Sequence, residues 1–375
     1  MLIGIDASRA VTTQRTGTEA YALHLLRSLL SLTAESPYLL RLYLNQTPPA
    51  ELFADYPHVE QCIIPMARLW SQVRLARELA QHPPELFFSP AHVIPFAYRG
   101  RSVATIHDLG FHHFPEAHTK SQLAYLKLST RLNGRSSSRL IADSKATKAD
   151  LVQFYNISPA KIDVIYPGID PRLTHVSDEV QITAAQHKYG IKPPYLLYIG
   201  TLQPRKNLAR LVKAFVKSGL PHQLVLAGKK GWHARSILDT INNLAPLQRD
   251  AVLLPGYIDE EDKAGLISGA DVLLYPSLYE GFGFPLLEGQ ACGTPVLASD
   301  TSSLPEIAGN GAVLVDPLNI SELAESMRRI ASDYELRKQL VETGLINVRR
   351  FTWEKTAIHV LQTFDRVLSI PAGGN

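Results

Sequence analysis

Short apolar runs alternate with longer amphipathic segments along the whole chain, and this alternation limits the fold more than any other feature. The runs are rich in leucine and β-branched residues, and many show no polar alternation. Strands of this kind are buried on both faces, and strand–helix alternation produces parallel sheets with helices on each side. The sequence therefore predicts an α/β fold with doubly wound, Rossmann-like sheets.

The pattern assigns most of the elements. We expect strands over 2–6, 39–44, 62–64, 86–89, 103–107, 140–143, 162–166, 195–199, 223–227, 252–254, 272–275, 296–298 and 313–315. Helical periodicity predicts helices over 18–32, 70–81, 146–155, 208–217, 320–343 and 353–370.

The length of 375 residues favours two domains, because one hydrophobic core seldom serves so long a chain. A turn-rich segment, Tyr166-Pro167-Gly168-Ile169-Asp170-Pro171, and a polar stretch that ends at Pro193-Pro194 mark the boundary. We place an N-terminal domain at 1–178 and a C-terminal domain at 179–352. Pattern alone leaves open which of them the last helix, within 353–375, packs on.

Composition excludes several classes of function. A net charge of +3 gives no support for nucleic-acid binding, and two distant cysteines, Cys62 and Cys292, offer no disulfide framework. The first residues have no signal-peptide pattern and no run is long enough to span a bilayer, so we expect a cytoplasmic protein. The segment 66–82, with Arg68, Arg74 and Arg77, is either a solvated surface helix or a lipid-binding one.

The segment 271–306 has the strongest pattern of a binding site. Glu280 and Glu288 frame a turn of glycine and aromatic residues between two apolar runs. Gly281 and Gly283 allow close backbone approach, and Pro285 suits the first turn of a helix. A helix N-terminus favours an anion such as a diphosphate, and the two carboxylates suit hydroxyl donors beside it.

Three further loops follow predicted strands. Arg205 and Lys206 are placed to neutralise a diphosphate, and Gly17 precedes a predicted helix near the end of the first loop. His107-Asp108 closes another strand and is a candidate site pair. His112 and His113 suggest a metal, but they have no acidic partner at metal-ligand spacing, so we predict none.

Taken together, five segments in this order resemble the retaining glycosyltransferases of family 4, which have the GT-B fold. The segments are TIHDLGF (105–111), SKATKADLVQFYNISPAKIDVIYPGID (144–170), GTLQPRKNL (200–208), EGFGFPLLE (280–288) and GTPVLASDTSSLPEIAG (293–309). The resemblance covers nearly the whole chain. It implies two Rossmann-like domains that face each other across a crevice, with the last helix returning to the N-terminal domain.

The resemblance also implies roles. The catalytic group would be Glu280 on the donor sugar, Lys206 with Arg205 on the diphosphate, and His107 beside the transferred sugar. Glu288 would bind the ribose, and the remaining donor-binding residues would be Gly17, Tyr257, Ile258, Phe282, Gly283, Phe284 and Leu287. Two positions depart from the family pattern: Thr201 stands where an arginine is frequent, and Thr16-Gly17 stands for paired glycines.

The expected activity is transfer of a hexose to an acceptor hydroxyl with retention of configuration and without a metal or cofactor. The PRKNL and FGFPLLE forms look most like bacterial mannosyltransferases of surface polysaccharide synthesis. GDP-mannose is the first expected donor and a UDP-hexose the second. The acceptor would be a glycan or a polyprenyl-linked glycan, and the protein could contact the cytoplasmic face of the membrane peripherally. A non-hydrolysing sugar-nucleotide epimerase and a non-catalytic nucleotide-sugar binding protein remain as alternatives.

Overall fold

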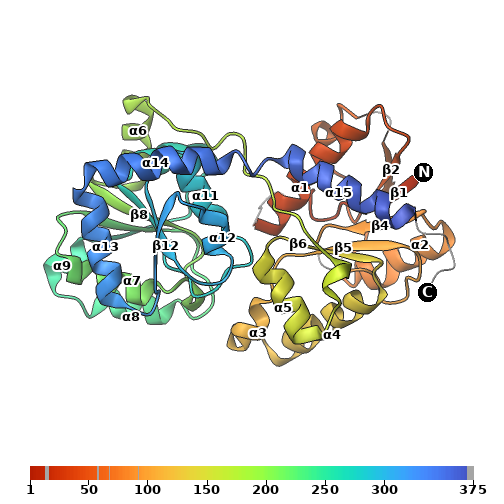
Figure 1. Cartoon of the computed structure of the whole chain (residues 1–375), viewed down its shortest axis with the longest axis horizontal. Helices are drawn as coiled ribbons and strands as arrows, with labels where there is room; N and C mark the ends of the chain where they lie inside the picture. The colour runs from red at the N-terminus through yellow and green to blue at the C-terminus, as the bar shows by residue number, and fades with distance from the viewer. Residues whose placement is uncertain (13–16, 57–58, 67, 92, 370–375) are drawn as a thin grey trace. The chain divides into compact units, whose positions relative to one another are not determined.

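The computed structural model describes residues 1–12, 17–56, 59–66, 68–91 and 93–369, which form two units (Figure 1). Unit 1 contains Met1–Gly168 and the chain from Phe351 onward, and unit 2 contains Ile169–Arg350. The division falls at Gly168 rather than at 178 because the segment that follows bonds to unit 2. His175 Nδ1 donates to the Cys292 carbonyl at 3.0 Å, and the Val176 N–H donates to Ser268 Oγ at 3.0 Å.

Unit 1 is built on a seven-stranded, all-parallel sheet in the order β3-β2-β1-β4-β5-β6-β7. Its strands are β1 (Leu2–Asp6), β2 (Leu39–Leu44), β3 (Glu60–Ile63), β4 (Leu86–Ser89), β5 (Ser102–Ile106), β6 (Arg139–Ala142) and β7 (Ile162–Val164). Its main helices are α1 (Gly17–Thr33), α2 (Ala76–Gln81), α3 (Gly110–His113), α4 (Lys120–Ser136), α5 (Lys145–Tyr155) and α15 (Trp353–Leu368).

Alternating side chains of β4 show how the two faces of this sheet are covered. Phe87 belongs to the core cluster that includes Leu79 of α2 and Leu151 of α5. Its neighbour Phe88 points to the other face and packs edge-on against Phe364 of α15, with ring centroids 5.2 Å apart. Because both faces are covered, the strand is buried throughout, and its first three residues are apolar, as the sequence indicated.

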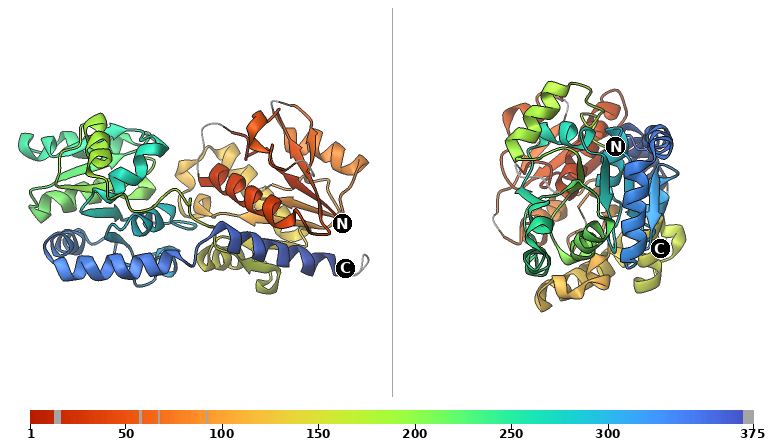
Figure 2. Two further views of the ribbon diagram at one scale, coloured as in Figure 1. Left: turned by 90° about the horizontal axis from the view of Figure 1, so that it is seen from above. Right: turned by 90° about the vertical axis from the view of Figure 1, so that its left-hand side faces the viewer.

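The last helix, α15, packs on unit 1 beside α1 (Figure 2). Trp353 begins α15 and packs edge-on against Tyr21 of α1, and Thr356 Oγ1 donates to the Tyr166 carbonyl at 2.8 Å. The chain at Gly168 passes so close to this helix that a Cβ there would lie 2.3 Å from the Trp353 nitrogen. Residue 168 must therefore be a glycine for α15 to pack as it does.

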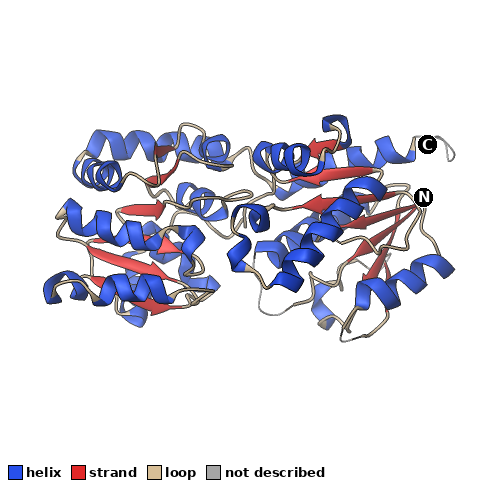
Figure 3. Cartoon of the chain, turned by 90° about the horizontal axis from the view of Figure 1, so that it is seen from below, coloured by secondary structure: helices blue, strands red, loops and turns tan. Residues whose placement is uncertain are grey.

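Unit 2 has a six-stranded, all-parallel sheet in the order β10-β9-β8-β11-β12-β13, and in each unit helices flank the sheet (Figure 3). Its strands are β8 (Tyr195–Ile199), β9 (Gln223–Ala227), β10 (Val252–Gly256), β11 (Val272–Tyr275), β12 (Val296–Ser299) and β13 (Ala312–Val315). Its helices are α6 (Glu179–Tyr189), α7 (Leu208–Ser218), α8 (Arg235–Asn242), α9 (Pro246–Asp250), α10 (Glu260–Ser268), α11 (Phe284–Ala291), α12 (Leu304–Ala308), α13 (Ile320–Ser332) and α14 (Tyr334–Val348).

Three helical segments differ from the sequence prediction. Helix α6 lies inside the polar stretch that marks the predicted domain boundary, and Asp178 caps it by accepting from the Val180 N–H at 2.9 Å. The helix predicted over 320–343 is two helices, because Asp333 ends α13 and caps α14. The helix predicted over 70–81 has nearly these bounds, but it begins with a π-helical segment, Ser71–Leu75, and becomes a regular α-helix only at Ala76.

Candidate functional site

The loop between β11 and α11 places Glu280 at the carboxyl edge of the unit 2 sheet. Gly283 is the N-cap of α11, with φ of +114°, and a Cβ there would lie 2.7 Å from Leu304 Cδ2. Pro285 follows in the first turn, where a missing N–H costs no hydrogen bond. This sharp, glycine-dependent entry into a helix is the geometry that the spacing of Gly281, Gly283 and Pro285 predicted.

The loop that precedes α12 holds this turn in place. Ser302 Oγ accepts from the Glu280 N–H at 2.9 Å. Ser303 Oγ lies 2.9 Å from the Glu280 carbonyl and 2.7 Å from the Phe282 carbonyl. Both serines belong to the GTPVLASDTSSLPE segment, so one part of the sequence motif positions the backbone of the other.

A charged cluster formed by Arg205, Lys206 and Glu280 lies behind the turn. Lys206 Nζ is 2.5 Å from Glu280 Oε1 and 2.8 Å from the Tyr275 hydroxyl, and Arg205 Nη1 is 2.8 Å from Glu280 Oε2. Arg205 also donates to the Tyr279 carbonyl at 2.5 Å. The side chains of Lys206 and Glu280 are 9% and 8% exposed, so this is a nearly buried ion cluster.

The cluster fixes the charge of Glu280. Burial alone would raise the pKa of this carboxyl, but the charges of Arg205 and Lys206 outweigh burial and lower the pKa to about 2. Two cations and one carboxylate leave one net positive charge beside the N-terminus of α11, where the helix dipole is also positive. The arrangement therefore favours an anion at the carboxyl edge of this sheet.

Glu288, about one turn after the first residue of α11, pairs with a cation from another helix. Lys263 of α10 donates to Glu288 Oε1 at 2.7 Å. Burial alone would lower the pKa of Lys263, but the charges of Glu288 and Glu260 raise it. Glu288 Oε2 is buried and has no hydrogen-bond partner among the described residues. A buried acceptor of this kind is stabilised when a ligand hydroxyl donates to it.

The other predicted donor-binding residues of unit 2 lie in different environments. Tyr257 is 48% exposed after β10, with Lys229 Nζ 4.8 Å from its ring centroid, and Ile258 is buried. Phe282 and Phe284 pack edge-on with centroids 5.0 Å apart. Leu287 is fully buried, so its side chain belongs to the core of unit 2 rather than to an open site.

Two predicted site residues lie in unit 1. His107 follows β5, with Nδ1 2.7 Å from Asp143 Oδ2 and Nε2 3.0 Å from the Pro90 carbonyl oxygen. Gly17 is the exposed first residue of α1. Thr16, its neighbour in the predicted phosphate loop, lies outside the described residues.

The histidines that suggested a metal form other contacts. His112 Nε2 lies 2.8 Å from the Tyr155 hydroxyl, and His113 Nε2 lies 3.0 Å from Asp150 Oδ2. Within the described ranges, the acidic or histidine groups close enough together to share an ion are Asp259, Glu261 and Asp262, which are exposed or half-buried. The Lys188 ammonium already bonds to the first and last of these, at 2.9 and 2.6 Å.

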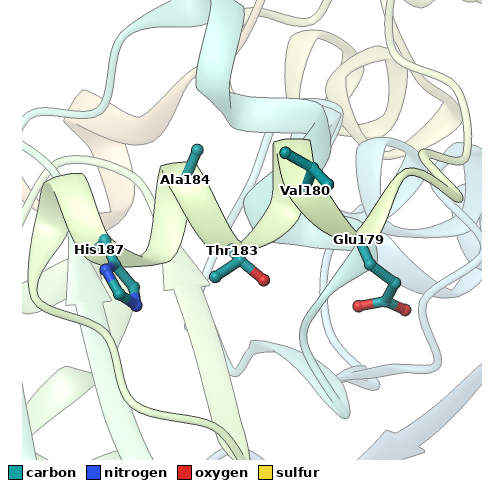
Figure 4. Close-up of a pocket in the computed structure, with 5 residues that line it drawn as sticks. All are labelled: Glu179, Val180, Thr183, Ala184 and His187. Carbon is teal, nitrogen blue, oxygen red and sulfur yellow. The ribbon is translucent and has the colours of Figure 1, made fainter.

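A shallow hollow on α6 holds none of the predicted site residues. It is lined by Glu179, Val180, Thr183, Ala184 and His187 of that one helix (Figure 4). The cluster at Glu280, rather than this hollow, is therefore the candidate functional site.

The structure adds partners that sequence reasoning missed. Lys263 and Tyr275 reach the site from α10 and β11, and no local pattern connected them to Glu288 or Lys206. Asp143, in contrast, could have been found from the sequence. It is an acid that directly follows the buried strand β6, and β6 pairs with β5, the strand before His107. Parallel neighbours end at the same edge of a sheet, so the two side chains were predictable neighbours.

Comparisons with known proteins show the family to which this chain belongs. Residues 16–173 match the family described as Glycosyltransferase Family 4, and residues 181–345 match Glycosyl transferases group 1. The O-antigen chain mannosyltransferase B of Escherichia coli is 26% identical over 80% of this chain and 80% of its own length. The O-antigen chain mannosyltransferase RfbU of Salmonella typhimurium is 26% identical over 68% of this chain and 71% of its own length.

Other relatives are much longer than the matching region. The serotype-specific mannosyltransferase WbdA of Escherichia coli is 26% identical over 61% of this chain, but the match spans only 29% of WbdA.

Among solved structures, sucrose-phosphate synthase from Thermosynechococcus elongatus superposes with a TM-score of 0.75 at 22% identity, over 98% of this chain and 99% of that one. The GT-B fold expected from the sequence, with two all-parallel α/β domains, is confirmed.

The ion cluster predicts how stability depends on pH. Glu280 has a folded-state pKa of about 2 against an ordinary value of 4.5, so its contribution is complete above about pH 5 and is lost as the pH falls toward 2. Between pH 5 and pH 3 this group should remove about 2 kcal/mol of unfolding free energy. Urea unfolding of the wild type and of Glu280→Gln at each pH, followed by circular dichroism, measures this change in unfolding free energy.

The Glu280→Gln variant should lose this part of the pH dependence. The control is Glu325→Gln, because Glu325 is exposed on α13 and its replacement should leave the pH dependence as it is in the wild type. Equal slopes of stability against pH for the wild type and Glu280→Gln would contradict the ionised cluster.

Proposed function

Since the chain belongs to the glycosyltransferases that join a family 4 domain to a group 1 domain, we propose that it transfers a mannose from a nucleotide-diphosphate sugar to an acceptor hydroxyl with retention of configuration. The observation that carries this proposal is the cluster of Arg205, Lys206 and Glu280 beside the N-terminus of α11. It combines a net positive charge for a diphosphate with a carboxylate for sugar hydroxyls.

The donor in this proposal is GDP-mannose, with a UDP-hexose as the second choice. The names of the curated relatives support mannose, because O-antigen chain mannosyltransferase B and RfbU match most of this chain. The acceptor is a glycan carried on a polyprenyl lipid, and the reaction takes place in the cytoplasm. The exposed ring of Tyr257 and the neighbouring Ile258 contact the base, and Gly17 contacts the donor phosphates from unit 1.

The leaving group is stabilised by side chains in this mechanism. Arg205 and Lys206 attract the diphosphate. Their attraction to it increases as negative charge develops on the leaving oxygen, and it is strong because the site is nearly buried. Fixed cations and the N-terminus of α11 perform the task that a divalent ion performs in other enzymes. The proposal therefore includes no metal.

Glu280 binds the sugar and does not attack it. The ion cluster keeps the carboxylate anionic. Both of its oxygens accept hydrogen bonds from Arg205 and Lys206, and these bonds make the carboxylate a poor nucleophile. The bond from C1 to the diphosphate oxygen breaks as the bond from C1 to the acceptor oxygen forms on the same face. The acceptor proton passes to the departing diphosphate, which balances the step.

Contact with a membrane is a further part of the proposal. Just before α2, Leu69 and Val73 are 71% and 47% exposed, and the same stretch of sequence carries the exposed Arg68, Arg74 and Arg77. Exposed apolar side chains among basic ones suit an anionic lipid surface. No described helix is long and apolar enough to span a bilayer. Co-sedimentation with phosphatidylglycerol vesicles should exceed that with phosphatidylcholine vesicles; equal sedimentation would contradict this surface.

The reaction itself is tested with radiolabelled GDP-mannose, UDP-glucose and UDP-galactose and lipid-linked glycan acceptors. We expect product only with GDP-mannose, with the α-configuration of the donor retained in the product, and with undiminished turnover in excess EDTA. Transfer only from a UDP-hexose would show that GDP-mannose is not the donor and would favour the second choice. Complete loss in EDTA that a divalent ion restores would contradict the metal-free mechanism. An epimerised donor formed without acceptor, or binding without turnover, would favour the alternative functions.

The ribose contact of Glu288 has its own test. Its buried Oε2 and the Lys263 pair predict that a guanosine diphosphate binds more tightly than its 2′,3′-dideoxy analogue. Loss of a charge-assisted hydrogen bond should weaken binding by at least about tenfold. Calorimetry should show this discrimination in the wild type and in the surface variant Glu325→Gln, but not in Glu288→Gln. Unchanged discrimination in Glu288→Gln would remove Glu288 from the ribose site.

A further inference from the structure

The side chain of His107 in unit 1 is held at both ring nitrogens. Nδ1 lies 2.7 Å from Asp143 Oδ2, and Nε2 lies 3.0 Å from the carbonyl oxygen of Pro90. A carbonyl oxygen only accepts, so Nε2 must carry a hydrogen to make that bond. An ionised carboxylate also only accepts, so Nδ1 must carry one as well. With Asp143 ionised, the two bonds are satisfied together only by an imidazolium.

Each neutral form of the ring would lose one of these bonds. Removing the proton from Nδ1 would turn a lone pair toward the Asp143 carboxylate, and removing it from Nε2 would turn a lone pair toward the Pro90 carbonyl. In a buried site an unmade bond of this kind costs about 1–3 kcal/mol, and more beside a charge. Both acceptors therefore oppose loss of the proton, although burial of the ring favours the neutral form.

Asp143 depends on the same proton. It is 2% exposed, and its second oxygen, Oδ1, is buried without a hydrogen-bond partner in the described part of the chain. An ionised carboxylate so poorly hydrated needs a neighbouring cation, and the imidazolium of His107 is that cation. The two side chains form a pair that holds one proton between them, on Nδ1 because imidazole is the stronger base.

The other groups around His107 do not weaken this conclusion. Asp108, the next residue, adds negative charge that favours the imidazolium. Tyr21 of α1 packs edge-on against the imidazole at 4.7 Å, and burial raises the pKa of its hydroxyl well above the ordinary value, so it stays neutral. Thr147 of α5 donates its hydroxyl to the His107 carbonyl at 3.2 Å and holds the backbone.

We propose that Asp143 is a positioning residue that, with the Pro90 carbonyl, keeps His107 as a fixed imidazolium at the carboxyl edge of the unit 1 sheet. His107 then supplies a positive ring edge and does not act as a general base. Its side chain is 17% exposed against 3% for Asp143, so the positive end of the pair is the more accessible one. The inference uses the proposed function only for its consequence in catalysis, which is that the acceptor proton leaves by another route.

Nuclear magnetic resonance of the full chain with 15N-labelled histidine tests the proposal without any turnover. His107→Gln identifies the His107 signals. We expect both ring N–H groups of His107 to persist above pH 6.5, the ordinary pKa of a histidine, in the wild type. In Asp143→Asn, where the charge is lost but an acceptor remains, the pKa of His107 should fall by at least about one unit, since the loss of an adjacent opposite charge has this size. Asp108→Asn should lower it by less than half as much, because Asp108 bonds to the Gly110 N–H and not to the ring.

A wild-type His107 with a pKa at or below the ordinary value of 6.5 would overturn the proposal, and this result does not require any variant to fold. An unchanged pKa of His107 in Asp143→Asn would overturn the role of Asp143. Once a donor is known, kcat/KM of the wild type should show no His107 ionisation near pH 6.5, where an ordinary histidine titrates. In Asp143→Asn it should fall by about tenfold per pH unit above the lowered pKa of His107. Failure of all turnover would concern the proposed function, whereas the NMR result concerns this pair alone.

Discussion

The ion cluster of Lys206, Arg205 and Glu280 is the interaction on which the rest of unit 2 depends. It joins the loop after β8 to the loop after β11, and the Leu278 N–H donates to the Arg205 carbonyl at 2.9 Å alongside it. Removing one partner of a buried ion pair costs about 3–5 kcal/mol because the other charge stays desolvated. This buried ion cluster lies at the carboxyl edge of the sheet, where a ligand anion can also pair with the two cations.

The two units place differently charged clusters at the carboxyl edges of their sheets. In unit 2 two cations face one carboxylate and leave a net positive charge. In unit 1 one cation, His107, faces the buried carboxylate of Asp143, and the pair is neutral overall. Attraction for a diphosphate therefore belongs to unit 2, whereas unit 1 offers only an oriented positive edge. This difference agrees with the proposal that the cations of unit 2 hold the diphosphate of the donor.

Sequence reasoning succeeded where the information is local. The strands 2–6, 39–44, 86–89, 195–199, 223–227 and 272–275 have the predicted bounds, because each is a buried apolar run between turn formers. Gly283 and Pro285 also specify their turn by themselves. The failures required tertiary contacts: Lys263 reaches Glu288 from another helix, and Asp178 makes a helix of a stretch without clear periodicity. The break at Asp333 was predictable from capping, but continuous periodicity on both sides concealed it.

The central claim is that Lys206 and Arg205 hold a diphosphate. Calorimetric titration of the full chain with GDP and with GMP tests it most directly, because the two ligands differ by the phosphate that the cluster would contact. The account predicts that GDP binds more tightly than GMP, and that Lys206→Ala reduces this preference by about tenfold or more, as expected for a lost charge-assisted bond. The exposed Lys213 of α7 is the control, and Lys213→Ala should keep the preference. A Lys206→Ala variant that distinguishes GDP from GMP as well as the wild type does would contradict the account.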